Sequence, residues 1–309
     1  MSDPISEPAS ELDNLDEFRQ SLLTWYDEGH RSFPWRETTD PYRILVSEVM
    51  SQQTQLSRVR EGYEAFIDRW PTVNSLASAS RSDVVAFWSN HSLGYNNRAR
   101  YLHEAAKQII SEFDGEFPRE PSELQTLQGV GPYTANAVAS FAFNNGNAVV
   151  DTNVKRVLHR ALSEGRENET QRYEETANAL MPAGESRRWN NAIMELGGTI
   201  CGKTPRCDER SCPLRNWCHA YKTGDFTAPD VQNQPTFEGS RRQFRGRIIQ
   251  ILSRDGPLST ADLGPRVRVD HDPESESDRE WLTDILADLE EEGLVEMAEE
   301  QGETIARLK

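Results

Sequence analysis

The chain has 309 residues, of which 36% are apolar, so it can form a compact core together with a smaller appended module. Its formal net charge of −17 argues at first against a nucleic-acid partner, because phosphate-binding proteins are normally basic. However, only five of its 34 basic residues are lysines, and this arginine-rich, acidic composition resembles that of proteins from salt-loving organisms, whose net charge reflects the solvent more than the ligand. An ordinary acidic cytosolic protein is the alternative.

The first segment, residues 1–14, is rich in Ser, Pro, Glu and Asp and shows no apolar period, which predicts a disordered acidic arm. It lacks the basic region and the apolar stretch of a secretory signal, and no run of about 18 apolar residues occurs in the chain. We therefore expect a cytoplasmic protein without a membrane segment.

Residues 15–222 alternate helical apolar patterns with short polar breaks and are predicted to be mainly α-helical. Within them, the segment from Asp40 to Gln55 places Glu48 among apolar residues of one helix. These neighbours are Leu45, Val46, Val49 and Met50. Partial desolvation would raise the pKa of Glu48 and let it hold a proton near neutral pH, which makes it a candidate general acid. The alternative is a surface residue of an amphipathic helix.

Two glycines, Gly129 and Gly131, surround one apolar residue directly before a predicted helix. Such a turn can lie against a phosphate, because glycine does not obstruct the approach and the backbone donors at the helix start face an anion. A tight turn between two helices is the alternative.

Asp151 follows two valines and precedes a predicted helix. An aspartate in this setting can stay ionised near a developing cation. A helix N-cap is the alternative for this residue.

All four cysteines fall in residues 201–218, at Cys201, Cys207, Cys212 and Cys218. In a reducing cytosol this clustering favours a metal site over two disulfides. Four thiolates suit an iron–sulfur cubane, and a tetrahedral zinc site is the alternative.

Residues 223–239 accumulate Pro, Asn, Gln, Thr and Gly without an apolar period, as a linker does. Residues 240–309 then predict a small winged-helix-like α+β domain. Its expected elements are helices over 245–254, after Ser259 and over 278–291, and strands over 294–297 and 304–308. The helix over 278–291 has an acidic face, so we expect it to pack or to bind a protein partner instead of reading DNA.

The segment from Leu124 to Ala135, with Val149 to Val157 following at suitable spacing, resembles the helix-hairpin-helix motif of the endonuclease III superfamily. The segment from Asp40 to Gln55 resembles the signature of its adenine-specific branch, the MutY family. The resemblance covers residues 15 to about 221. It implies a two-lobed, mainly α DNA glycosylase fold with an iron–sulfur cluster loop.

The implied activity is hydrolysis of the N-glycosidic bond of adenine mispaired with guanine or 8-oxoguanine. The implied partner is duplex DNA with such a mispair, bound by a monomer associated with the nucleoid. Glu48 would protonate an imidazole-ring nitrogen of adenine, and Asp151 would stabilise the sugar cation. Tyr133 stands where strand-cutting members carry lysine, and tyrosine cannot form a Schiff base, so weak or absent lyase activity is implied. Tyr133 and Asn153 would position Asp151 or the departing base.

The resemblance also implies contacts with DNA. The segment from Ser92 to Arg100 resembles the family loop whose tyrosine, here Tyr95, wedges into the base stack during nucleotide extrusion. Gln53 and Thr54 would contact the opposite purine. The hairpin would contribute Gly129, Gly131 and Thr134 to DNA binding, and the residues matching the adenine pocket are Phe33, Trp35, Arg36 and Glu195.

The four cysteines stand where the family has its [4Fe–4S] ligands, but their spacing of five, four and five residues departs from the usual six, two and five. The implied cluster is structural, holding a loop with Arg206, Arg210 and Arg215 close to the DNA backbone. The C-terminal region does not match the Nudix-like domain that typical members append, so a preference for oxidised guanine does not follow.

Two other functions stay open. One is a thymine-mismatch or pyrimidine-lesion glycosylase on the same fold. The other is a non-catalytic iron–sulfur DNA-binding regulator. Glu48 argues against the first, and the presence of both Glu48 and Asp151 argues against the second, because a regulator needs neither an acid nor a cation stabiliser.

Overall fold

Helix α1 (Leu15–Gly29) shows how the sequence pattern produces the core. Phe18, Leu22 and Tyr26 recur about one helical turn apart, and all three are buried. They belong to one hydrophobic cluster with Trp189 and Leu196 of α11 (Ser186–Thr199). Helix α1 therefore folds against α11.

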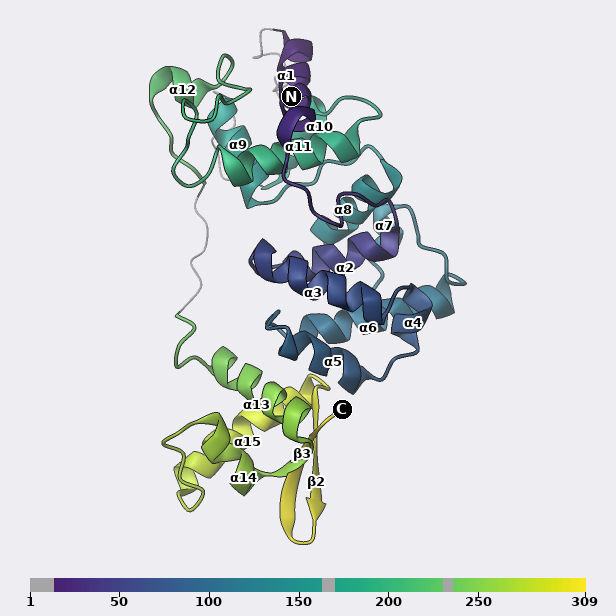
Figure 1. Cartoon of the computed structure of the whole chain (residues 1–309), viewed down its shortest axis with the longest axis vertical. Helices are drawn as coiled ribbons and strands as arrows, with labels where there is room; N and C mark the ends of the chain where they lie inside the picture. Colours follow the sequence, from purple (N-terminus) through teal and green to yellow (C-terminus); the bar gives the residue numbers. More distant parts are fainter. Residues whose placement is uncertain (1–13, 163–169, 230–235) are drawn as a thin grey trace, which may run out of the picture. The chain divides into compact units, whose positions relative to one another are not determined.

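The computed structural model describes residues 14–162, 170–229 and 236–309, so the expected acidic arm lies outside the described residues except for Asn14. Within these ranges the chain forms fifteen helices and three short strands, which confirms the mainly α fold class (Figure 1). It separates into a first unit (residues up to 44, 119–125 and 130–233) and a second unit (45–118, 126–129 and 234–309). Helix α2 (Pro41–Ser51) passes from the first unit into the second. No helix in the described ranges is long and apolar enough to cross a membrane.

The first unit is built around α11, which contacts α1, α8 and α9. Its remaining helices are α7 (Pro121–Leu124), α8 (Pro132–Phe143), α9 (Thr152–Ala161), α10 (Thr170–Leu180) and α12 (His219–Thr223). Helices α11 and α9 approach closely at Gly197, where a Cβ atom would lie 2.7 Å from the Cβ of Asn153. A side chain at position 197 would therefore displace the start of α9.

The second unit contains a cluster of aromatic rings at its centre. Its first helices are α3 (Leu56–Arg69), α4 (Val73–Ala77), α5 (Arg81–Asn90) and α6 (Asn97–Glu112). Phe66 packs against Trp70, Phe87 and Trp88 with ring centroids 4.8 to 6.5 Å apart. These contacts join α3 to α5, and α6 packs against both α4 and α5.

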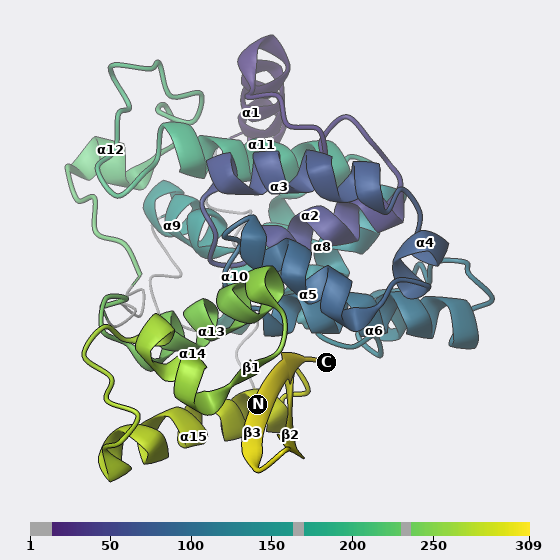
Figure 2. The same cartoon turned by 60° about the horizontal axis from the view of Figure 1, so that its bottom comes forward.

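The C-terminal part of the second unit is the small α+β module that the sequence predicts. Its elements are α13 (Arg241–Asp255), β1 (Leu258–Ser259), α14 (Thr260–Val267), α15 (Glu276–Glu291), β2 (Val295–Glu300) and β3 (Glu303–Leu308). The antiparallel sheet has the order β1-β3-β2, with Ala306 opposite both Leu258 and Met297. Helix α13 lies along α5 (Figures 1 and 2).

The guanidinium group of Arg98 joins the end of α2 to the loop before α6. Arg98 is 7% exposed, and its Nη1 donates to the carbonyl oxygens of Val49 (2.8 Å), Met50 (3.3 Å) and Gln52. Carbonyls at a helix C-terminus lack intrahelical donors and carry the negative end of the helix dipole, so a cation is favourable there.

The other terminal nitrogen of Arg98 binds the loop on the opposite side. Its Nη2 donates to the carbonyl oxygens of Leu93 (2.7 Å) and Gly94 (3.1 Å) and to the hydroxyl of Thr54 (3.0 Å). Burial lowers the pKa of Arg98 to about 10, which leaves the group charged at neutral pH. One side chain therefore fixes the relative positions of residues 49–54 and 93–94.

Replacing Arg98 with methionine should lower the free energy of unfolding by about 3 kcal/mol or more, because several buried carbonyl oxygens would lose their donor. Arg60→Met is the matched control, since the Arg60 side chain is 60% exposed and pairs with Glu64 on the surface. The control should change stability by less than about 0.5 kcal/mol. Thermal unfolding in high salt measures both, and equal stability of the two variants would contradict this role of Arg98.

Candidate active site

Glu48 lies in the last turns of α2, on the part of that helix that belongs to the second unit. Its side chain is half-buried, while Leu45, Val46, Val49 and Met50 are all buried. Glu48 is thus a half-buried carboxylate on a helix whose neighbouring apolar residues are buried.

Gln53 and Thr54 form the turn that follows α2. Gln53 is exposed and has a positive φ of 55°, which is uncommon for a residue with a side chain. The hydroxyl of Thr54 donates to the carbonyl oxygen of Leu93 at 2.9 Å and accepts from Arg98. Thr54 therefore links this turn to the loop that carries Tyr95.

Tyr95 lies at the surface of the second unit, in the loop between α5 and α6. Its side chain is 37% exposed and its φ is 48°. The loop is held from inside, because the indole nitrogen of Trp88 donates to the carbonyl oxygen of Gly94 at 2.7 Å. The guanidinium carbon of Arg98 lies 5.4 Å from the centroid of the Tyr95 ring.

The two glycines of the hairpin have different local requirements. Gly129 has a φ of 76°, and a Cβ atom there would lie 2.5 Å from the Cβ of Tyr101, so only glycine fits. Gly131 is the N-cap of α8 with an ordinary φ of −83°, and a Cβ there would meet nothing within 4 Å. The chain packing thus requires Gly129 but leaves open space around Gly131.

Tyr133 and Thr134 lie in the first turn of α8. The side chain of Tyr133 is half-buried, whereas that of Thr134 is buried with 3% exposed. Thr134 therefore presents almost no surface to a ligand outside the protein.

Asp151 is the N-cap of α9 and also part of a wider polar chain. Its Oδ1 accepts from the backbone N–H of Val154 at 2.7 Å, and its Oδ2 accepts from the amide of Asn153 at 2.8 Å. Arg156 in turn donates to the side-chain oxygen of Asn153 at 2.7 Å and to the carbonyl oxygen of Cys201 at 2.7 Å. Asp151, Asn153 and the beginning of the cysteine loop are therefore held together in the first unit.

Glu195 is 1% exposed and forms ion pairs with two arginines of the first unit. Arg31 donates to it from Nε (2.7 Å), Nη2 (3.0 Å) and its backbone N–H (3.2 Å), and Arg36 donates from Nη1 (2.9 Å). Burial alone would raise the pKa of Glu195, but the hydrogen bond from Arg31 and the charge of Arg36 outweigh it and lower the pKa. Four donors occupy the acceptor positions of this carboxylate.

Phe33 and Trp35 stack on each other with ring centroids 5.0 Å apart and an interplanar angle of 10°. The guanidinium of Arg36 lies 5.0 Å from the centroid of Phe33. The expected adenine-pocket residues Phe33, Trp35, Arg36 and Glu195 thus form one group in the first unit, which the ion pairs of Glu195 hold in place.

The cysteine loop carries four free thiols in the first unit. Burial raises the pKa of Cys212 to about 12, with further increases from Cys207, Cys201 and Cys218 nearby. Arg160 lies beside this loop, where its Nη1 is 3.5 Å from the sulfur of Cys201 and 2.7 Å from the carbonyl oxygen of Gly202. Among the described residues, no three His, Cys, Asp or Glu side chains converge on a single metal ion.

The predicted residues therefore form separate groups in the two units. The second unit holds Glu48, Gln53, Thr54 and Tyr95 around Arg98, and the first unit holds the Asp151 and Glu195 groups. The arginines that join these residues were not predicted from the sequence; they are Arg31, Arg98, Arg156 and Arg160. Most of their acceptors are backbone carbonyls from other segments, so no motif signals them.

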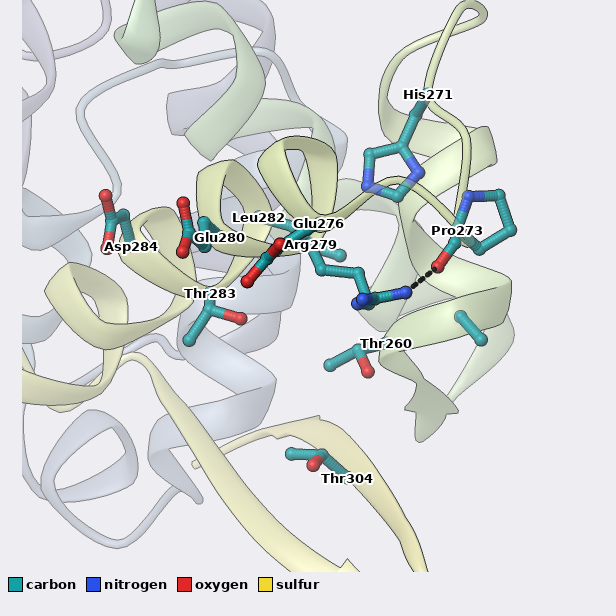
Figure 3. A pocket seen from close by; sticks show the side chains of 11 residues that line it. Thr260, His271, Pro273, Glu276, Arg279, Glu280, Leu282, Thr283, Asp284 and Thr304 are labelled. Carbon is teal, nitrogen blue, oxygen red and sulfur yellow. Dashed lines mark hydrogen bonds between the residues drawn. The ribbon is translucent and has the colours of Figure 1, made fainter.

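A hollow of about 660 Å³ in the C-terminal module is lined by none of the predicted site residues (Figure 3). Its wall includes Glu276, Glu280 and Asp284, and Arg279 donates there to the carbonyl oxygen of Pro273 at 3.1 Å. This acidic lining does not favour a phosphate.

Comparison with known proteins relates the chain to DNA repair enzymes. Residues 46–183 match the HhH-GPD superfamily of base excision DNA repair proteins. An adenine DNA glycosylase of Mycolicibacterium smegmatis is 41% identical over 249 residues, which cover 78% of this chain and 83% of that protein. The human adenine DNA glycosylase is 40% identical over 217 residues, covering 66% of this chain and 39% of that protein.

Solved structures with a similar fold include a thymine-DNA glycosylase and endonuclease III. A thermostable thymine-DNA glycosylase aligns with a TM-score of 0.62 and 30% identity, over 68% of this chain and all of that one. Endonuclease III trapped on DNA aligns with a TM-score of 0.58 and 25% identity, over 69% of this chain and 99% of that one. Because the adenine-specific relatives are the more similar in sequence, the chain belongs to the adenine DNA glycosylases of the HhH-GPD base excision repair superfamily and is an enzyme that acts on adenine.

Proposed function

We propose that this adenine DNA glycosylase hydrolyses the glycosidic bond of adenine mispaired with guanine or 8-oxoguanine in duplex DNA. The observation that carries the proposal is the half-buried position of Glu48, on α2 between buried apolar residues. A carboxyl group in such surroundings can keep a proton near neutral pH and deliver it to a leaving group.

Each carboxylate has a separate task in this mechanism. Glu48 donates a proton to an imidazole-ring nitrogen of adenine, so that the base leaves as a neutral molecule. The carboxylate of Asp151 stabilises the positive charge that develops on the sugar. The hydrogen bonds from Val154 and Asn153 fix the orientation of this carboxylate, and a water molecule completes the hydrolysis.

Tyr133 supports a base-removing reaction without efficient strand cleavage. Strand cleavage of the lyase type requires an amine that forms a Schiff base with the sugar, and a phenol cannot do so. Tyr133 instead positions Asp151 or the departing base, together with Asn153.

The exposure of Tyr95 and Gln53 and the open space around Gly131 support the proposed contacts with DNA. Tyr95 enters the base stack when the nucleotide is extruded, and Gln53 and Thr54 contact the opposite purine. The open space at Gly131 supports close approach of a phosphate to the start of α8, with Thr134 contributing through its backbone. Gly129 acts indirectly by allowing the turn.

The adenine pocket is formed by the stacked rings of Phe33 and Trp35 with Arg36 beside them. Glu195 supports this segment instead of contacting the base, because Arg31 and Arg36 already use its acceptor positions. This assignment keeps Glu195 essential for the pocket while giving it no direct part in base recognition.

We further propose that Cys201, Cys207, Cys212 and Cys218 hold a [4Fe–4S] cluster. Four free, buried or half-buried thiols in one loop are the donor set that this cluster takes, and Arg160 contacts the sulfur of Cys201 at 3.5 Å. Because the thiols of the described residues do not converge on one metal position, binding requires the loop to close around the cluster. Bound iron would keep the thiols deprotonated despite their burial and would fix the loop that bears the exposed Arg206, Arg210 and Arg215.

Replacing Glu48 with glutamine should slow adenine release by about 100- to 10,000-fold while binding of the mispaired duplex is retained, since only the proton donor is lost. Single-turnover base release and a binding titration, both in molar salt, measure the two effects. Glu61→Gln removes an exposed carboxylate from α3 in the same unit and should leave the rate unchanged. Unchanged cleavage by the Glu48 variant would reject the mechanism.

The substrate is tested with three duplexes in the same assay: adenine opposite guanine, adenine opposite 8-oxoguanine, and thymine opposite guanine as the control. We expect release of adenine from the first two and none of thymine. Failure to release adenine from either mispair would overturn the proposed specificity.

Replacing Cys212 with serine should remove the visible absorption of the cluster and reduce the bound iron and inorganic sulfide, because one ligand is lost. These quantities are measured on the purified protein and do not depend on activity. Ser211→Ala, at the neighbouring exposed position, should keep all of them. Iron absent from the unaltered protein, or stoichiometric zinc in its place, would refute the cluster.

Replacing Glu195 with glutamine should cost about 3 kcal/mol of stability at neutral pH, because one partner of a buried ion pair is removed. The pKa of Glu195 is lowered in the folded protein, so the stabilisation is present above the ordinary pKa of 4.5 and is lost as the pH falls through the lower folded value. Unfolding measured against pH should therefore show the difference between variant and unaltered protein shrinking below about pH 4.5. Glu185→Gln, which breaks an exposed pair with Arg188, should cost under about 1 kcal/mol, and a pH-independent difference for Glu195→Gln would contradict the assignment.

A further inference from the structure

The C-terminal module contacts the loop that carries Tyr95. Both belong to the second unit, where α13 packs along α5, the helix that leads into this loop (Figure 2). Asn90 at the end of α5 donates to the hydroxyl of Ser253 in α13 at 3.1 Å. The module is therefore anchored directly before the loop.

Arg242, in the first turn of α13, reaches Tyr95 itself. Its Nη1 donates to the phenolic oxygen of Tyr95 at 2.8 Å, and its guanidinium carbon lies 5.5 Å from the centroid of the Tyr95 ring. The same guanidinium lies 5.3 Å from the ring of Phe237, which is 55% exposed. A hydrogen bond and a cation–π contact thus act on one exposed aromatic side chain.

A second contact holds the other end of the loop. The amide of Asn97 donates to the carboxylate of Glu292, which also pairs with Arg245 of α13. Arg241 and Arg245 both pair with Asp288 of α15, so the start of α13 is fixed to α15 by its neighbouring arginines. These ion pairs hold the start of α13 in place and so fix the backbone position of Arg242 next to Tyr95.

We propose that Arg242 is a positioning residue for Tyr95, and that the C-terminal module takes part in nucleotide extrusion through this contact. The inference rests on the proposed role of Tyr95 as the residue that enters the base stack. An exposed tyrosine loses conformational freedom when it inserts between bases, and a side chain that already orients the ring reduces this loss before DNA binds.

The test is a double-mutant cycle with Arg242→Gln, Tyr95→Phe and the combined variant. Tyr95→Phe keeps the ring and removes the oxygen that accepts from Arg242. Extrusion is followed by the fluorescence of 2-aminopurine placed next to the target adenine, and chemistry by single-turnover adenine release. We expect each single variant to slow extrusion by about 5- to 10-fold and the double variant to be slowed by clearly less than the product of the two effects, because both single variants already lose the hydrogen bond between these residues.

Three further measurements separate positioning from a structural role. Arg242→Lys retains a cation and a donor and should restore the rate to within about threefold of the unaltered protein. Arg254→Gln removes the same charge from the far end of the same helix, where Arg254 is exposed and pairs with the adjacent Asp255, so extrusion should be unchanged. With adenine opposite an abasic site, where less stacking has to be broken, the effect of Arg242→Gln should shrink.

Additive effects of Arg242→Gln and Tyr95→Phe, an unchanged rate with Arg242→Gln, or faster extrusion by that variant would overturn the inference. Tyr95→Ala tests the underlying function separately. If Tyr95→Ala extrudes the nucleotide as fast as the unaltered protein, the role of Tyr95 fails; if it is slow while the cycle shows no coupling, only the role of Arg242 fails.

Discussion

The second unit depends on the buried guanidinium group of Arg98, whose positive charge is stabilised by the backbone carbonyl groups around it. Arg98 donates to carbonyl oxygens of Val49, Met50, Leu93 and Gly94, and these residues come from two segments more than 40 positions apart. A buried cation is costly unless its donors are satisfied, so the segments cannot separate without exposing both the charge and the carbonyls. The position of Glu48 on α2 and that of Tyr95 in its loop are thus set by one side chain.

In the first unit, arginine side chains likewise bind backbone carbonyl oxygens close to Asp151 and the cysteine loop. Arg156 joins Asn153 to the carbonyl oxygens of Gly197 and Cys201, and Arg160 binds the carbonyl oxygen of Gly202. Each arginine presents several donors in a planar fork and can bridge segments in this way, whereas the compact ammonium of lysine cannot span the same acceptors. The scarcity of lysine, which the composition first links to a salty solvent, therefore coincides with an internal use of arginine.

The helical elements and the C-terminal module were predictable because they follow from local patterns. Helix α13 begins four residues earlier than expected, because Ser240, the first residue of the predicted C-terminal domain, accepts from the backbone N–H of Gln243 and caps the helix. Glu195 could be placed near the pocket only by resemblance. Its partner Arg31 lies more than 160 positions away in the sequence. The acceptors of Arg98 are mostly backbone carbonyl groups, which every residue type has, so the sequence does not indicate which residues they belong to. The long-range contacts of the buried arginines therefore could not be predicted from the sequence.

The contacts of the C-terminal module explain why helix α15 is so acidic. Asp288 and Glu292 pair with Arg241 and Arg245, so these acidic side chains stabilise the arginine-rich start of α13. That helix end lies against residues of α5 and the Tyr95 loop within a single compact unit. A module packed in this way is joined to the Tyr95 loop by side-chain contacts and not by the backbone alone. If Tyr95 enters the base stack as we propose, the module acts on base removal through the loop that it holds.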